Sequence, residues 1–274
     1  MIGSVFSPYY AWAGRNEPEN HIALNVGLYG KGVKRWTMTE RGRSALTQQP
    51  DHLGIGPSNL TWDGKALRIE IDEWANPFPR KVTGTITIIP EALAGTSFQL
   101  DGKGRHYWHP LAPRARTKVK FDKPGLDWEG TAYIDSNWGS EPLEAGFVNW
   151  DWSRAHLHDG TGILYDAFTR DGQNRQLALR INKDGTADQL VPPPRSTLKK
   201  GPIWRVNRST LCATSTVPKT LKMLEDTPFY TRSHVKTMFE EEAVIAVHES
   251  LDCNRFASNW VRCLLPFRMP KVTR

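Results

Sequence analysis

The 274-residue chain carries 36 basic and 29 acidic side chains, a net charge of +7, and 39% of its residues are hydrophobic. This length suits one large domain or two modest ones, with enough apolar residues for a sizeable core. The positive charge suits contact with an anionic surface, such as lipid headgroups or nucleic acid, without selecting between them. No RNA-binding, zinc-finger or helix-turn-helix pattern accompanies the basic residues, so nucleic-acid binding is not expected.

Cysteine usage and the N-terminus narrow the choice of compartment. Three cysteines leave one unpaired and form no Cys-x-x-Cys motif, which favours a reducing cytoplasm over a disulfide framework or a zinc site. No metal site is expected from the histidine spacings, and no run approaches the 18 apolar residues typical of a membrane-spanning helix. The start lacks the basic segment of a signal peptide. We interpret it as a strand, carrying Tyr10 and Trp12, whose upstream part is missing.

Strand patterns dominate the chain. Apolar and polar residues alternate at 67–72, 82–88 and 177–181, and residues 243–247 form a continuous apolar run. Only residues 219–225 are compatible with a helical turn. Asp-Gly pairs, which are typical of tight hairpin turns, stand at 63–64, 101–102, 159–160, 171–172 and 184–185. Many short strands with frequent turns predict an all-β antiparallel sandwich or barrel.

The domain organisation is read from turn residues and from the two halves of the chain. A boundary is predicted after the Glu-Pro-Leu-Glu sequence at 141–144, which gives domains of residues 1–144 and 145–274. A proline-rich stretch at 191–195 is interpreted as a loop inside the second domain. Both halves are rich in strands, and two related barrels are therefore expected.

A candidate acid lies in the tryptophan-rich stretch 126–152. Read as a strand through residue 137, it places Tyr133, Asp135 and Asn137 on one face. Burying a charged carboxylate beside aromatic and apolar neighbours is unfavourable, so Asp135 should find a partner or hold a proton. The alternative is an aspartate that closes a strand and hydrogen-bonds the following turn.

A second aromatic strand precedes this one. Alternation in His106-Tyr107-Trp108-His109 puts His106 and Trp108 on one face and Tyr107 and His109 on the other. Tryptophans in an all-β protein commonly serve packing alone. A barrel lined by Trp and Tyr around one carboxyl would instead form a water-poor cavity for a large apolar ligand.

Several uncommon motifs carry a resemblance over nearly the whole chain. These are Phe6-Ser-Pro-Tyr-Tyr-Ala-Trp-Ala-Gly-Arg15, Glu19-Asn-His21, Trp36-Thr-Met-Thr-Glu-Arg-Gly-Arg43, Tyr133-Ile-Asp-Ser-Asn-Trp-Gly-Ser-Glu-Pro-Leu-Glu144, Trp150-Asp-Trp-Ser-Arg154 and Pro266-Phe-Arg-Met-Pro270. In these motifs the chain resembles the bacterial carotenoid 1,2-hydratases, also called hydroxyneurosporene synthases. Members of that family usually have further residues ahead of the first strand.

The resemblance implies two lipocalin-like β-barrels and a hydro-lyase without a cofactor. Such an enzyme adds water to the terminal C1–C2 double bond of acyclic carotenoids such as neurosporene and lycopene, giving 1-hydroxy carotenoids. The same scaffold also serves terpenoid cyclases and Diels–Alder catalysts, so the fold alone does not settle the reaction. A carotenoid or lipid carrier would need the cavity without the acid, and a related cyclase would use the acid while excluding water. The motifs favour hydration over both.

Hydration without a metal or cofactor requires a strong proton donor, and an apolar pocket keeps an aspartic acid protonated at neutral pH. The resemblance and strand parity together assign this role to Asp135, ahead of Asp151, Glu141 and Glu144. The remaining candidates are Trp108 and Tyr133 as cation stabilisers, His106 as the residue that orients water or holds Asp135 protonated, and Tyr10, Trp12, Trp138 and Trp150 as substrate-binding residues. Because the substrate dissolves in lipid, we expect a cytoplasmic protein that associates peripherally with the inner or photosynthetic membrane through basic and aromatic loops.

Overall fold

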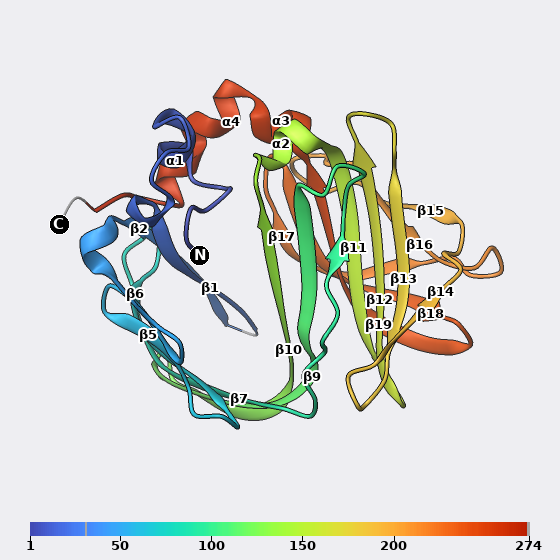
Figure 1. The fold of residues 1–274 in the computed structure, drawn as a ribbon, viewed down its shortest axis with the longest axis horizontal. Coiled ribbons are helices and arrows are strands. Elements are labelled where there is room, and N and C mark those ends of the chain that lie inside the picture. The colour runs from blue at the N-terminus through green and yellow to red at the C-terminus, as the bar shows by residue number, and fades with distance from the viewer. Residues whose placement is uncertain (31, 273–274) are drawn as a thin grey trace. The chain divides into compact units, whose positions relative to one another are not determined.

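The computed structural model describes residues 1–30 and 32–272 of the chain (Figure 1). Long antiparallel strands account for most of the regular structure, and the helices are short. The predicted all-β antiparallel class is confirmed. Among the described residues, no helix is long and apolar enough to cross a membrane.

The contacts divide the chain into two compact units. Unit 1 consists of residues 1–90, 116–132 and 262–274, and unit 2 consists of residues 91–115 and 133–261. Both units are therefore discontinuous in sequence, whereas the sequence-based boundary after residue 144 is a single cut. The reason is that β9 (His106–Lys123) and β10 (Leu126–Gly139) are long enough to contribute residues to both units.

Unit 1 is built around an antiparallel sheet in which β9, β7, β6, β5, β4 and β3 are neighbours in that order. The strands β1 and β2 form a separate antiparallel pair. The elements of unit 1 are α1 (Pro8–Trp12), η1 (Pro18–Asn20), β1 (Ile22–Gly30), β2 (Val33–Arg41), η2 (Arg43–Ala45), β3 (Leu46–Gln49), β4 (His52–Ile55), β5 (Ser58–Trp62), β6 (Leu67–Trp74), β7 (Lys81–Pro90) and η3 (Leu265–Phe267). Its core gathers Val26, Ile71, Val82, Val119 and Phe121.

Unit 2 contains a second antiparallel sheet with the order β14, β13, β12, β11, β19, β18 and β17 (Figure 1). The short pair β15 and β16 packs on this sheet. The elements of unit 2 are β8 (Phe98–Gln99), α2 (Leu143–Gly146), β11 (Phe147–Leu157), β12 (Gly160–Thr169), β13 (Arg175–Ile181), β14 (Ala187–Leu190), β15 (Arg195–Leu198), β16 (Arg208–Leu211), β17 (Lys219–Asp226), β18 (Tyr230–Phe239), β19 (Glu242–Asp252), α3 (Cys253–Ala257) and α4 (Asn259–Leu264), the last of which ends in unit 1.

Alternation along β11 creates two chemically different faces. Asp151, Ser153, Ala155 and Leu157 are buried on one face, where Ala155 and Leu157 join the core cluster with Leu164, Leu211, Phe239 and Val244. A side chain at position 162 would collide with the Phe239 ring, since an added Cβ would lie 2.6 Å from it, which explains Gly162. The other face of β11 carries Trp150, Trp152, Arg154 and His156, and it is this face that meets the candidate site.

The local turn signals are confirmed. The five Asp-Gly pairs lie at the connections β5–β6, β8–β9, β11–β12, β12–β13 and β13–β14, and Gly160 is already the first residue of β12. The strands predicted at 67–72, 82–88, 177–181 and 243–247 are β6, β7, β13 and part of β19. These features depend only on neighbouring residues, which is why the sequence reveals them.

Two local predictions are wrong. Residues 8–12 form the helix α1 and not a strand, because Pro8 occupies the first turn and the Ser7 hydroxyl accepts the Tyr10 N–H at 2.9 Å as an N-cap. Residues 219–226 form the strand β17 and not a helical turn. The register of β17 against β18 shifts twice, and these irregularities interrupt the two-residue period by which a strand is recognised.

Candidate active site

Three predicted residues meet at the carboxyl group of Asp135. The indole Nε1 of Trp108, on β9, donates a hydrogen bond to Asp135 Oδ2 at 2.8 Å. The hydroxyl of Tyr133, two residues away on the same face of β10, donates to the same oxygen at 3.1 Å. The structure therefore brings Trp108, Tyr133 and Asp135 together, all within unit 2.

The two hydrogen bonds distinguish the oxygens of this carboxyl group. Because Oδ2 accepts from both donors, the proton of the acid form belongs on Oδ1. Burial raises the pKa of Asp135 above its ordinary value, and the bonds from Trp108 and Tyr133 oppose that rise. The pKa of the Tyr133 hydroxyl is raised well above its ordinary value by burial and by the adjacent Asp135, so the phenol remains a donor. The site holds a half-buried acid with a defined proton-bearing oxygen.

Aromatic rings surround the acid. Trp108 is fully buried, with its ring centroid 5.6 Å from Phe98 and 5.8 Å from Tyr165. Trp150 continues the series at 6.2 Å from Tyr165. Trp152 lies 5.7 Å from the ring of Tyr133. These rings place π-electron density near the acid.

Arg154 lies beside the ring of Tyr133. Its guanidinium carbon lies 5.0 Å from the centroid of the Tyr133 ring, and its Nη1 lies 2.9 Å from His156 Nε2. Burial lowers the pKa of Arg154, and the nearby Tyr133, Asp135 and Glu249 oppose this effect. Glu249 itself is paired with Arg232 at 2.7 Å. The Arg154 guanidinium therefore makes a cation–π contact with the ring of Tyr133.

Arg154, Trp152 and Tyr165 also lie in this part of unit 2, and none of them was predicted from the sequence as a site residue. Parity along β11 places Trp152 and Arg154 on the face of Trp150, and that signal was present in the sequence. Tyr165 lies opposite Trp152 across the β11–β12 pairing, and no local pattern reveals which strand will pair with which.

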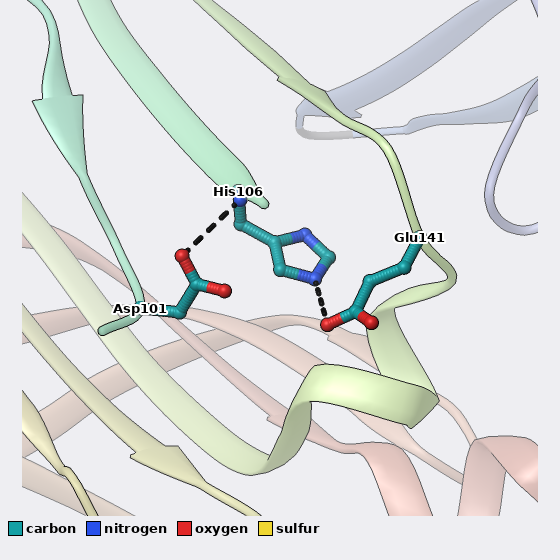
Figure 2. Close-up of side chains that lie close together, drawn as sticks. All are labelled: Asp101, His106 and Glu141. Atoms are coloured by element: carbon teal, nitrogen blue, oxygen red, sulfur yellow. Dashed lines mark hydrogen bonds and ion pairs between the residues drawn. The ribbon is translucent and has the colours of Figure 1, made fainter. Parts of the chain in front are cut away.

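His106 lies in a neighbouring polar cluster with Asp101 and Glu141 (Figure 2). Its Nε2 lies 3.3 Å from Glu141 Oε1, and its backbone N–H donates to Asp101 Oδ1 at 3.4 Å. Burial lowers the pKa of His106, although Asp101 and Glu141 oppose that shift. The imidazole is turned toward Glu141, so the structure gives no contact in support of the predicted hydrogen bond to Asp135.

The ligand atoms of Asp101, His106 and Glu141 lie within 4.8 Å of one another, close enough for one cation. Their other contacts are those of a hydrogen-bonded connection between loops, and they fit this role better than the binding of a metal ion. Asp101 Oδ1 also accepts the Arg105 N–H at 2.9 Å, and the Arg105 guanidinium holds Glu141 Oε2 at 2.6 Å. The Glu141 carboxylate, which a metal ion would need as a ligand, is therefore already paired with the Arg105 guanidinium.

Asp151, the second candidate acid, lies on the opposite face of β11. It accepts hydrogen bonds from the Ser209 hydroxyl at 2.6 Å, the Ser250 hydroxyl at 2.5 Å and the Ser209 N–H at 3.2 Å. Burial raises its pKa to about 6. His248, 4.0 Å away, donates from Nε2 to the Ser209 carbonyl, and burial lowers its pKa to about 3. Asp151 is held by serines within the core, whereas Asp135 lies among aromatic rings.

The four predicted substrate-binding residues are distributed over both units. Trp150 belongs to the aromatic group of unit 2, and Trp138 stacks on Tyr107 with a centroid distance of 5.6 Å. Tyr10 belongs to unit 1, where its ring lies 4.9 Å from His21, and Trp12 is 56% exposed in the same helix. The substrate-binding roles of all four residues stay predictions.

Comparison with known proteins identifies the family that the whole chain matches. The family model "Carotenoid hydratase CrtC" matches residues 1–274. The chain is 53% identical over 275 residues to an acyclic carotenoid 1,2-hydratase of Thiocapsa roseopersicina, covering 99% of this chain and 68% of the relative. It is 41% identical over 272 residues to an acyclic carotenoid 1,2-hydratase of Cereibacter sphaeroides, covering 99% of this chain and 96% of the relative.

Solved structures give a more distant neighbour. The crystal structure of CghA with Sch210972 matches with a TM-score of 0.45 and 12% sequence identity, over 80% of each chain.

Proposed function

We propose that this chain, which belongs to the carotenoid hydratase CrtC family, is a hydratase that acts on acyclic carotenoids. Its substrates are proposed to be carotenoids such as neurosporene or lycopene, to which it adds water at the terminal C1–C2 double bond. The product is a tertiary alcohol, a 1-hydroxy carotenoid. The observation that carries this proposal is the half-buried acid Asp135, held on one oxygen by Trp108 and Tyr133 in an aromatic-rich part of unit 2.

In the first step, Asp135 Oδ1 transfers its proton to C2. The π electrons of the double bond form the new C–H bond, and the O–H electrons remain on the carboxylate. A tertiary cation results at C1. Trp108 and Tyr133 are bound to Oδ2, where they stabilise the negative charge that appears as the proton leaves. The burial that raises the pKa of Asp135 keeps the acid form available before the step.

Aromatic faces stabilise the cation at C1. Each cation–π contact is worth about 0.5–2 kcal/mol, depending on how far the site is desolvated. We assign this role to Trp108, to its neighbour Tyr165, and to Trp150, which contacts Tyr165. Tyr133 contributes chiefly through its hydroxyl, because the Arg154 guanidinium already lies over its ring and would repel a second cation there.

In the second step, water attacks C1 and gives up a proton to the Asp135 carboxylate. A C–O bond forms, an O–H bond of the water breaks, and the acid is restored. The sum of both steps is the addition of one water molecule. Neither a carrier nor a cyclase would complete this cycle, because a carrier needs no acid and a cyclase must keep water from the cation.

The experiment that tests this proposal is incubation of the purified chain with neurosporene or lycopene in detergent, carried out in H₂¹⁸O. Mass spectrometry should detect a product with one labelled hydroxyl group. The Asp135→Asn variant should remain folded and lose turnover by a factor of about 10²–10⁴. Asp127→Asn is the matched control, since Asp127 is exposed on the same strand. Full turnover by Asp135→Asn would refute the donor role, and unchanged pigment with the wild-type chain would refute the hydratase.

A further inference from the structure

A group of exposed apolar side chains stands on one loop and one helix of unit 2. Ile203 is 75% exposed, Trp204 is 37% exposed, and Trp260 on α4 is 50% exposed. The rings of Trp204 and Trp260 stack at a centroid distance of 6.0 Å and an interplanar angle of 28°. We name these three residues the Trp204 patch. Large apolar side chains gathered in this way are characteristic of interaction surfaces.

The loop that carries the patch is held in place by its backbone. Asp226 Oδ2 accepts the N–H groups of Ile203 at 2.7 Å and Trp204 at 3.4 Å. From the other side, the Arg255 guanidinium donates to the Trp204 carbonyl at 2.5 Å. The loop closes on itself through the Gly201 N–H, which donates to the carbonyl of the fully buried Val206 at 3.1 Å. The outward direction of Ile203 is therefore fixed by hydrogen bonds that a mobile loop would lack.

Basic residues frame the patch. Lys199 and Lys200 precede the loop and Arg205 lies within it, all three with exposed side chains. The Asp226 carboxylate accepts two backbone N–H groups of this loop. The surface thus offers apolar rings together with positive charge. Tryptophan is favoured at the boundary between headgroups and acyl chains, and lysine and arginine are attracted to anionic lipid.

We propose that the Trp204 patch is a membrane-docking surface that inserts Ile203, Trp204 and Trp260 into the interfacial region of an anionic bilayer. This inference rests on the proposed function, because an acyclic carotenoid is dissolved in the hydrocarbon of a membrane and the enzyme must reach it there. Neighbouring exposed cations match the charge of such a bilayer, which is the reason to prefer it to an apolar protein partner.

Flotation with vesicles tests the proposal without any substrate. The full chain is mixed with vesicles of phosphatidylcholine containing phosphatidylglycerol, or of phosphatidylcholine alone. We expect binding to the anionic vesicles that weakens as salt is raised. The double variant Ile203→Ser and Trp260→Ser should bind at least about tenfold more weakly, since each change removes a side chain that would be buried in the membrane. Val217→Ser is the control, because Val217 is 90% exposed outside the patch.

Each outcome bears on the patch directly. Unchanged vesicle binding by the double variant, or an equal loss with Val217→Ser, would overturn the proposal. If the wild-type chain forms a dimer that the double variant loses, and vesicle binding is unaffected, the patch is an interface between copies and the proposal is wrong. Circular dichroism of the variant verifies the fold.

Two further measurements separate this inference from the hydratase proposal. With pigment supplied in detergent, the double variant should retain wild-type hydration, because the acid at Asp135 is untouched. The Asp135→Asn variant should bind vesicles as the wild-type chain does. Vesicle binding without hydration by the wild-type chain would leave the patch supported and refute the enzyme alone.

Discussion

Removing one of the two donors on Asp135 is a direct test of how the site sets its acidity. The Tyr133→Phe substitution keeps the ring and deletes only the hydroxyl that donates to Asp135 Oδ2 at 3.1 Å. This bond favours the ionised carboxylate and lowers the pKa of Asp135 against the effect of burial. A hydrogen bond to a charged group contributes about 1.5–3 kcal/mol. Since one pKa unit corresponds to about 1.4 kcal/mol, the pKa of Asp135 should rise by about 1–2 units.

The pH dependence of hydration reports this change. The reaction requires the protonated acid, so activity falls as the pH rises through the pKa of Asp135. In Tyr133→Phe this falling limb should move to higher pH by about 1–2 units. The rate on the acidic plateau should decrease at the same time, because a weaker acid gives up its proton more slowly. Initial rates of ¹⁸O incorporation across a pH series measure both effects.

Two comparisons sharpen the result. Trp108→Phe removes the other donor to the same oxygen and should move the limb in the same direction. Tyr107→Phe is the matched control, because Tyr107 lies on the opposite face of β9 and stacks on Trp138. A limb that stays in place in both Tyr133→Phe and Trp108→Phe would show that these donors do not tune Asp135.

Three further predictions concern the surrounding structure. Phe147→Ala should lower the free energy of unfolding by about 3–5 kcal/mol in denaturant titrations, because the fully buried Phe147 ring packs on His106; a loss below 1 kcal/mol would contradict its core role. Glu141→Gln should lower the pKa of His106 in an NMR titration, since the Glu141 carboxylate opposes the effect of burial there; a rise would contradict this electrostatic argument. Asp151 stabilises the fold below its ordinary pKa of 3.8, and this contribution is lost as the pH rises to about 6. His248 stabilises the fold above its ordinary pKa of 6.5, and this contribution is lost as the pH falls toward about 3. Between pH 3.8 and 6 the two effects on stability therefore cancel. Against the wild-type profile, His248→Gln should make stability fall with rising pH by about 1.4 kcal/mol per unit and Asp151→Asn should make it rise equally, and slopes of the same sign would refute the pairing.

The sequence by itself determined the class of the fold and the common strand face of Tyr133 and Asp135, but it did not predict that Trp108 and Tyr133 donate hydrogen bonds to the acid. Two-residue alternation is a property of the extended backbone, so Tyr133 and Asp135 share a face wherever the strand lies. Asp-Gly turns likewise depend on the conformations open to those two residues. The same two-residue alternation places His106 and Trp108 on one face, and both are buried in the structure.

The tertiary structure alone decided which strands surround the acid. Tyr165 reaches the site because β12 pairs with β11. Arg154 reaches it because the face of β11 that carries Trp150 and Trp152 contacts Tyr133. Pairing between strands depends on contacts far apart in the chain, which a local pattern does not contain. The partner of His106 was hidden for the same reason, since Glu141 lies 35 residues further along. The short-range exception is α1, where one serine cap and one proline overrode an aromatic pattern that resembled a strand.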